Sequence, residues 1–170
     1  MTPLSPSPVN LAGLEEEYPY TSRFASINGF GYHYVDEGQG DPVLMVHGNP
    51  TWSFYFRALI KGLKGTHRVI APDHIGCGLS DKPGPGEYPF TLERRVKDFQ
   101  AFVEGLGLQQ KLTLVVHDWG GMIALAWAVQ HPERIGRLVI LNTAAFPPPG
   151  GKRLPLRLSL IRRSSQGHLR

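Results

Sequence analysis

The sequence has little cysteine and no long hydrophobic run. Cys77 is the only cysteine in 170 residues, so no disulfide can form within the chain, and we predict a reducing compartment, the cytoplasm. No apolar run reaches the roughly 18 residues that a transmembrane helix needs. Residues 1–10 lack the basic start and apolar centre of a secretory signal. These absences argue against a disulfide scaffold or a membrane protein, and 41% hydrophobic residues favour a folded globular domain.

Positive charge is concentrated at one end of the sequence. Residues 152–170 hold six lysines and arginines and no acidic residue, although the net charge of the whole chain is only +4. The preceding residues have 12 basic and 14 acidic side chains, a net charge of −2. A body with this balance lacks the basic surface that nucleic-acid binding requires, so we predict no nucleic-acid partner.

Hydrophobic periodicity predicts strands that alternate with helices. Two segments in which apolar and polar residues alternate, 23–28 and 32–37, predict a hairpin. Beyond them, short apolar runs typical of buried parallel strands are separated by helical patterns. The predicted strands cover residues 43–46, 68–71, 112–116 and 138–141, and the predicted helices cover 53–63, 91–105 and 120–130. This order predicts an open α/β sheet with helices on both faces.

The same pattern divides the chain into a core and two flanking segments. Residues 1–20 are rich in proline and serine and then acidic, which indicates a flexible arm or a segment that wraps the core. Residues 21–146 form the predicted core. A stretch of prolines and glycines then breaks the pattern, so residues 147–170 are interpreted as a linker followed by the first part of another helix, the stump of a cap.

One junction between a strand and a helix has the features of a nucleophilic site. An apolar run ends at Val116, and His117 and Asp118 are followed by Trp119 and two glycines that begin a helix. A sharp turn of this kind exposes the side chain at its apex and aims the next backbone N–H groups at a bound group. Asp118 stands at the apex, where the G-x-S-x-G pattern of hydrolases places serine. The alternative is that Asp118 only caps the helix.

Four segments together resemble the α/β-hydrolases with an aspartate nucleophile, the branch of haloalkane dehalogenases and epoxide hydrolases. They occur in the family's order and spacing: His47-Gly48-Asn49-Pro50, residues 73–80, residues 117–121 and residues 141–144. The resemblance implies the α/β-hydrolase fold with the first six strands of its sheet, two antiparallel and four parallel, and three helices. It also implies that the family's cap and last strands are missing from this sequence.

Two positions resemble the dehalogenases of this branch more than its epoxide hydrolases. Epoxide hydrolases usually have an aromatic residue before the proline of the first segment, whereas this sequence has Asn49. In dehalogenases such an asparagine and the tryptophan after the nucleophile clamp the departing halide, and Asn49 and Trp119 match both positions. The resemblance assigns the oxyanion hole to the backbone N–H groups of the same two residues. The surroundings of His47 and Trp52 also resemble the β-lactone decarboxylases of bacterial olefin biosynthesis, and both side chains are predicted to bind substrate.

The resemblance implies nucleophilic catalysis on a small hydrophobic substrate, with no metal and no cofactor. Asp118 would attack an electrophilic carbon and form an ester intermediate. In the hydrolytic members a histidine held by a carboxylate then activates water. This sequence has Asn142 where some dehalogenases have that acid, and only His168 lies near the end, where the family has its histidine. The competing hypothesis is a non-catalytic truncated fragment, whose strand 138–141 would be an uncovered edge prone to self-association.

Overall fold

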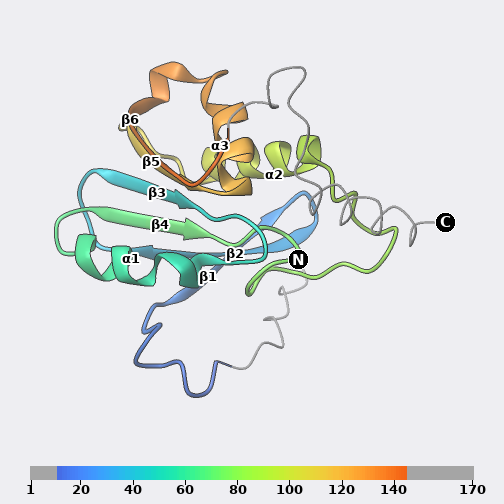
Figure 1. The fold of residues 1–170 in the computed structure, drawn as a ribbon, viewed down its shortest axis with the longest axis horizontal. Coiled ribbons are helices and arrows are strands. Elements are labelled where there is room, and N and C mark those ends of the chain that lie inside the picture. Colours follow the sequence, from blue (N-terminus) through green and yellow to red (C-terminus); the bar gives the residue numbers. More distant parts are fainter. Residues whose placement is uncertain (1–10, 145–170) are drawn as a thin grey trace.

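The computed structural model describes residues 11–144, which form a six-stranded mixed sheet flanked by helices (Figure 1). The second strand pairs antiparallel with the first and with the fourth strand in chain order, and the last four strands are mutually parallel. The predicted hairpin followed by four parallel strands is confirmed. In their order across the sheet the strands are β1 (Ser22–Ile27), β2 (Phe30–Glu37), β4 (Arg68–Pro72), β3 (Pro42–Val46), β5 (Leu112–His117) and β6 (Ile135–Leu141).

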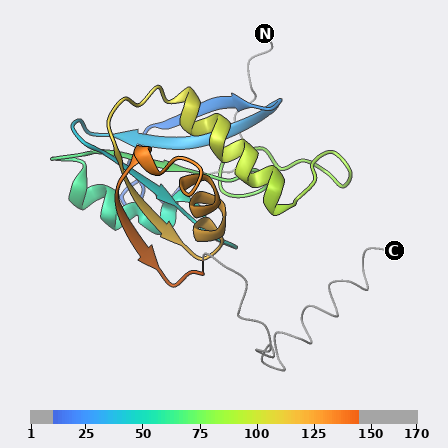
Figure 2. The same ribbon diagram turned by 90° about the horizontal axis from the view of Figure 1, so that it is seen from above.

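Helices cover both faces of the sheet (Figure 2). The 3-10 helix η1 (Ser53–Phe56) and α1 (Arg57–Leu63) lie on one face, and α2 (Leu92–Gly105) and α3 (Trp119–Ala128) lie on the other. A second 3-10 turn, η2 (Pro132–Arg134), leads into β6. Helix α2 begins after Thr91, whose hydroxyl accepts a hydrogen bond from the Arg94 N–H at 3.2 Å, as an N-cap does. None of the helices described in residues 11–144 has the length and apolarity to cross a membrane.

Side chains of the parallel strands alternate between two hydrophobic layers, because successive residues of a strand point to opposite faces. Leu44 and Val46 belong to the layer under α2 and α3, which is built around Phe99. Met45 belongs to the layer under α1, together with Phe56. All five residues of β3 are buried, as expected for a central parallel strand. The two layers make the sheet a rigid base for whatever its carboxyl edge carries.

The segment before β1 lies against the core as far as the structure describes it. Tyr18 is buried, its hydroxyl lies 2.5 Å from Ser53 Oγ, and its ring packs 5.0 Å from the ring of Trp52. Tyr18 therefore attaches the described part of this segment to the core, and the division of residues 1–20 from the core stays a prediction. The rest of the predicted arm, 1–10, and the predicted linker and cap stump, 147–170, lie outside the described residues.

Strand β6 is an edge of the described sheet. It pairs with β5 on one side, and Leu138, Val139 and Ile140 have 47%, 41% and 57% of their surfaces exposed. In the neighbouring strand β5 four of the six residues are buried and the other two are partly buried. Apolar side chains therefore remain accessible on both faces of β6, as the sequence predicts for an uncovered edge.

Candidate active site

Asp118 lies at the apex of the turn between β5 and α3. Its backbone has φ 50° and ψ −128°, a conformation that side-chain-bearing residues rarely adopt. The turn is tight because glycines follow it: a Cβ on Gly120 would overlap the Val46 carbonyl oxygen, and a Cβ on Gly121 would overlap Thr143. Helix α3 can therefore pack directly on the strand ends, and this packing holds Asp118 at the carboxyl edge of the sheet.

The loop after β3 brings a hydrogen-bond donor to Asp118. Strands β3 and β5 are parallel neighbours in which Val46 pairs with Val116, so their carboxyl ends meet. The Asn49 N–H donates to Asp118 Oδ1 at 2.9 Å. Gly48 makes this approach possible, because a Cβ there would overlap the Asp118 carboxylate. If Oδ2 forms an ester, Oδ1 becomes the ester carbonyl oxygen with the Asn49 N–H already in place.

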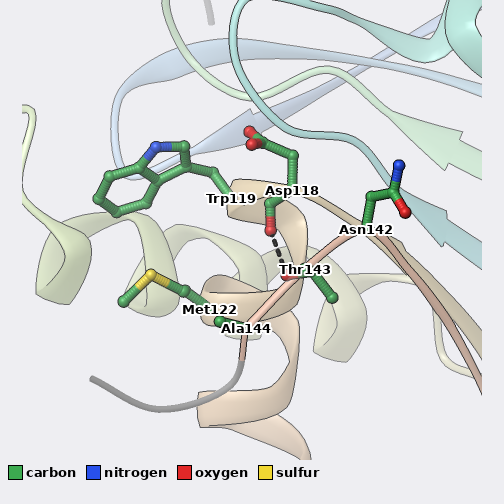
Figure 3. A pocket seen from close by; sticks show the side chains of 6 residues that line it. All are labelled: Asp118, Trp119, Met122, Asn142, Thr143 and Ala144. Carbon is green, nitrogen blue, oxygen red and sulfur yellow. Dashed lines mark hydrogen bonds between the residues drawn. The ribbon is translucent and has the colours of Figure 1, made fainter. Parts of the chain in front are cut away.

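A cavity of about 440 Å³ opens beside this turn. The Thr143 hydroxyl donates to the Asp118 carbonyl oxygen at 2.5 Å and ties the end of β6 to the turn. In the view of Figure 3 the Asp118 carboxylate lies between the indole of Trp119 and the amide of Asn142. Trp119 has 43% of its surface exposed, so its ring is available to a ligand. The cavity is lined by Asp118, Trp119, Met122, Asn142, Thr143 and Ala144.

The fold agrees with a comparison against protein families. The family described as alpha/beta hydrolase fold matches residues 41–161, which is most of the chain. The chain belongs to the alpha/beta hydrolase fold family. Within residues 11–144 this hydrolase fold is represented by six strands and the helices that flank them.

Three enzyme types recur among the similar hydrolases. The cis-3-alkyl-4-alkyloxetan-2-one decarboxylase of Shewanella oneidensis is 54% identical over 154 residues, 91% of this chain and 48% of that protein. A haloalkane dehalogenase of Sphingobium indicum is 41% identical over 128 residues, 74% and 43% of the two chains. The epoxide hydrolase CorEH superposes with a TM-score of 0.72 at 33% identity, over 85% of this chain and 50% of that one. The chain spans about half the length of the curated relatives it matches.

His47 supports the loop that carries Asn49. The His47 side chain is fully buried, its Nδ1–H donates to the Gly48 carbonyl at 2.8 Å, and its Nε2 accepts from the His74 N–H at 3.0 Å. Burial lowers the pKa of His47 and lowers that of His74 well below its usual value, so both rings are neutral. Within residues 11–144 the His47 side chain has no exposed surface and both of its nitrogens are hydrogen-bonded. Its predicted contact with a substrate stays a prediction.

Trp52 and His117 lie on the α1 side of the site. Trp52 is half-buried and stacks on Phe54 with ring centroids 5.5 Å apart, so its predicted contact with substrate stays a prediction. The His117 ring stacks on Tyr55 at 4.2 Å. Because neighbouring side chains of a strand alternate, His117 faces η1 although it directly precedes Asp118.

The buried polar network around Asp73 is a feature that sequence reasoning missed. Asp73 Oδ1 accepts from the Ser53 N–H at 2.7 Å, and Oδ2 accepts from the Leu79 N–H and from His33 Nδ1, each at 2.8 Å. Burial alone would raise the pKa of the Asp73 carboxyl, but the hydrogen bonds from His33 and Leu79 outweigh it and hold the pKa below its usual value. His33 and Asp73 are 40 residues apart, so no local pattern could have paired them.

Proposed function

We propose that the protein is an enzyme in which Asp118 attacks a strained cyclic ester, a β-lactone, and converts it into an alkene and carbon dioxide. The observation that carries the proposal is the Asp118 carboxylate at the apex of a strained turn, with the Asn49 N–H 2.9 Å from its Oδ1. The 54% identity to the cis-3-alkyl-4-alkyloxetan-2-one decarboxylase supports the choice of substrate class. Because that relative is about twice as long, the proposal concerns the chemistry that these residues contribute.

The reaction has two steps on Asp118. In the first step Oδ2 attacks the saturated ring carbon that is bonded to the ring oxygen, not the carbonyl carbon. The bond between this carbon and the ring oxygen breaks, and an ester on Asp118 forms beside a free carboxylate. In the second step the carboxylate leaves as carbon dioxide, its bonding electrons form the C=C bond, and the bond between carbon and Asp118 breaks. Inversion in the first step and anti elimination in the second convert a cis lactone into a cis alkene. No proton and no water is consumed.

Decarboxylation of the Asp118 ester needs no water-activation step. Hydrolysis of the ester would require a histidine to activate water. Within the described range 11–144, no histidine hydrogen-bonds to the Asp118 side chain. Decarboxylation needs only a good leaving group on carbon, and the Asn49 N–H stabilises the carboxylate that Asp118 becomes as it leaves.

Haloalkane dehalogenation is the second candidate. Asn49 and Trp119 are both exposed beside Asp118, which is what a pair of donors needs to receive a halide. Attack of Asp118 on the carbon would break the carbon–halogen bond and release the halide toward these donors. The first product of this reaction on the protein is an alkyl ester of Asp118, which peptide mass spectrometry detects.

The two activities are separated by product analysis with the full 170-residue chain. A cis-3,4-dialkyl β-lactone is incubated with the unmodified chain, with Asp118→Ala and with Asp41→Asn, a control at an exposed aspartate whose carboxylate is not hydrogen-bonded in the described chain. We expect cis alkene and carbon dioxide from the unmodified chain and from Asp41→Asn, and neither from Asp118→Ala. A 1-bromoalkane tests the second candidate, with mass spectrometry of the peptide that contains Asp118. If the unmodified chain forms no alkene from the lactone and no ester on Asp118 from the bromoalkane, both assignments are contradicted.

We propose further that β6 mediates self-association with a second copy of the chain. An antiparallel pair centred on Leu138 would place Arg137 opposite Val139, so no like charges meet. The three exposed apolar residues of β6 would then be covered by their counterparts. Val139→Lys sets a lysine opposite Arg137 and should shift the sedimentation coefficient toward the monomer, whereas Val129→Lys, at the exposed residue that follows α3, should not. An unmodified chain that sediments as a monomer at all concentrations would contradict this interface.

Cytoplasmic location is proposed from the state of the single thiol. Cys77 is partly buried, and burial raises the pKa of its thiol. The thiol therefore stays protonated and reacts slowly, which suits a reducing compartment where no disulfide is required.

A further inference from the structure

A serine, a histidine and an aspartate form a hydrogen-bonded chain at the β1 edge of the sheet. Ser22 Oγ at the start of β1 lies 3.1 Å from His33 Nε2 on β2. His33 Nδ1 lies 2.8 Å from Asp73 Oδ2 in the loop after β4. This order of groups, hydroxyl to imidazole to carboxylate, is the arrangement by which a histidine removes a proton from a serine.

The direction of each hydrogen bond follows from Asp73. Its buried carboxylate already accepts hydrogen bonds from the backbone N–H groups of Ser53 and Leu79. A carboxylate bound by such donors has no proton of its own to donate. His33 Nδ1 must therefore carry a proton and donate it to Asp73. In the neutral ring Nε2 then has a free lone pair, and the Ser22 hydroxyl is the donor to it. The imidazole is thus oriented with its basic nitrogen on the serine oxygen.

Exposure distinguishes the three groups. His33 and Asp73 have no exposed surface, whereas Ser22 is exposed. A reagent from solution can therefore reach the hydroxyl and not the base. Phe24 projects from the same face of β1 two residues further on, is 37% exposed, and lies with its ring 5.2 Å from that of His33. A small apolar group bound at Ser22 would contact the Phe24 ring.

This trio is separate from the Asp118 site. Strands β2, β4 and β3 lie between β1 and β5, the strand that ends at Asp118. Figure 1 shows β1 and β5 in different parts of the sheet. A reagent on Ser22 can therefore be assigned independently of the nucleophile described above.

We propose that Ser22 is a second nucleophile of this protein, with His33 as its general base and Asp73 as the residue that positions the base, and that it accepts acyl groups from small activated esters. In the acyl-transfer step the bond between Ser22 Oγ and the acyl carbon forms, and the bond between that carbon and the alcohol oxygen breaks. The Ser22 proton moves to His33 Nε2 and then to the leaving alkoxide or phenolate. The products are acyl-Ser22 and the free alcohol or phenol.

The test uses p-nitrophenyl acetate and the full chain in an Asp118→Asn background, so that the other nucleophile cannot contribute. Acetylation is followed by p-nitrophenolate release and located by peptide mass spectrometry. Ser26 is the internal control, because it is exposed on the same strand and its hydroxyl is not hydrogen-bonded to a histidine among the described residues. General-base assistance of the usual size predicts that Ser22 is acetylated about 100-fold faster than Ser26.

Variants assign the roles of the two groups. Ser22→Ala should remove the acetylated peptide and Ser26→Ala should leave its rate unchanged. His33→Gln retains an amide that can donate to Asp73 but lacks the base, and should slow Ser22 acetylation to the Ser26 rate, with tryptophan fluorescence reporting whether the fold is kept. Equal rates at Ser22 and Ser26 in the parent chain would overturn the proposal without any need for the His33 variant. If Asp118 is not alkylated in the bromoalkane experiment but Ser22 is still acetylated, the result counts against the proposed function and leaves the Ser22 proposal intact.

Discussion

Replacing Asp73 by asparagine tests how much the buried polar network stabilises the fold. Asp73 accepts three hydrogen bonds on two oxygens, from Ser53, Leu79 and His33. An asparagine has one oxygen, so its NH₂ group must face either the Ser53 N–H or the Leu79 N–H. Although His33 can adapt by changing its tautomer, a backbone N–H cannot. In either orientation at least one buried donor is left facing another donor.

The magnitude follows from these contacts. A buried donor left without a partner costs about 1–3 kcal/mol, and each bond to a charged acceptor that becomes neutral loses roughly another 1 kcal/mol. We therefore expect Asp73→Asn to lower the free energy of unfolding by about 3 kcal/mol. With an m-value of about 2 kcal/mol/M, the urea midpoint would fall by about 1.5 M.

The assay is urea unfolding followed by tryptophan fluorescence, for which the buried Trp127 is a suitable probe. Asp41→Asn is the matched control, because Asp41 is exposed. Its midpoint should stay within the error of the parent. A loss below about 1 kcal/mol for Asp73→Asn would refute the reasoning, since it would mean that the network adds little beyond an ordinary surface contact.

Three further outcomes are expected. Gly48→Ala places a Cβ in the Asp118 carboxylate and should reduce alkene formation or Asp118 alkylation about 100-fold, whereas Gly62→Ala, with no atom near its new Cβ, should not; equal product yields would contradict this. Phe99→Ala empties a fully buried site and should cost about 3–5 kcal/mol in urea unfolding, far more than Phe90→Ala, whose ring is 54% exposed. Because the Asp73 pKa is lowered in the folded state, its contribution is complete above the unfolded pKa of about 3.9 and is lost as pH falls through the folded value. The free energy of unfolding should therefore decrease less steeply with falling pH in Asp73→Asn than in the parent, as measured by urea unfolding at a series of acidic pH values.

Several elements could be predicted because their signals are local. Thr91 and the apolar stripe behind it predicted the helix that the structure describes as α2 (Leu92–Gly105). The apolar runs 43–46 and 112–116 predicted central strands that are buried on both faces. The turn at Asp118 was recognisable because a polar residue and two glycines end a buried strand, and each glycine makes room for a backbone or side chain that touches it.

Other features depend on residues that are distant in the sequence and had no local signal. The sequence around Tyr18 predicts a polar arm. In the structure its ring packs against Trp52 and its hydroxyl is hydrogen-bonded to Ser53. His47 looked suited to substrate contact because of its neighbours in the chain. In the fold it is enclosed by His74 and bonds only to the protein.

The sequence by itself determined the order of strands and helices, the hydrolase family and the position of Asp118, because periodicity, turn glycines and motif spacing are properties of neighbouring residues. The tertiary structure decided which polar groups meet. The contact between Asn49 and Asp118 and the chain from Ser22 through His33 to Asp73 both arise because sheet pairing brings together segments that are far apart in sequence. Burial then fixes the direction of each hydrogen bond, since a group removed from water must be paired by the partner that the fold supplies.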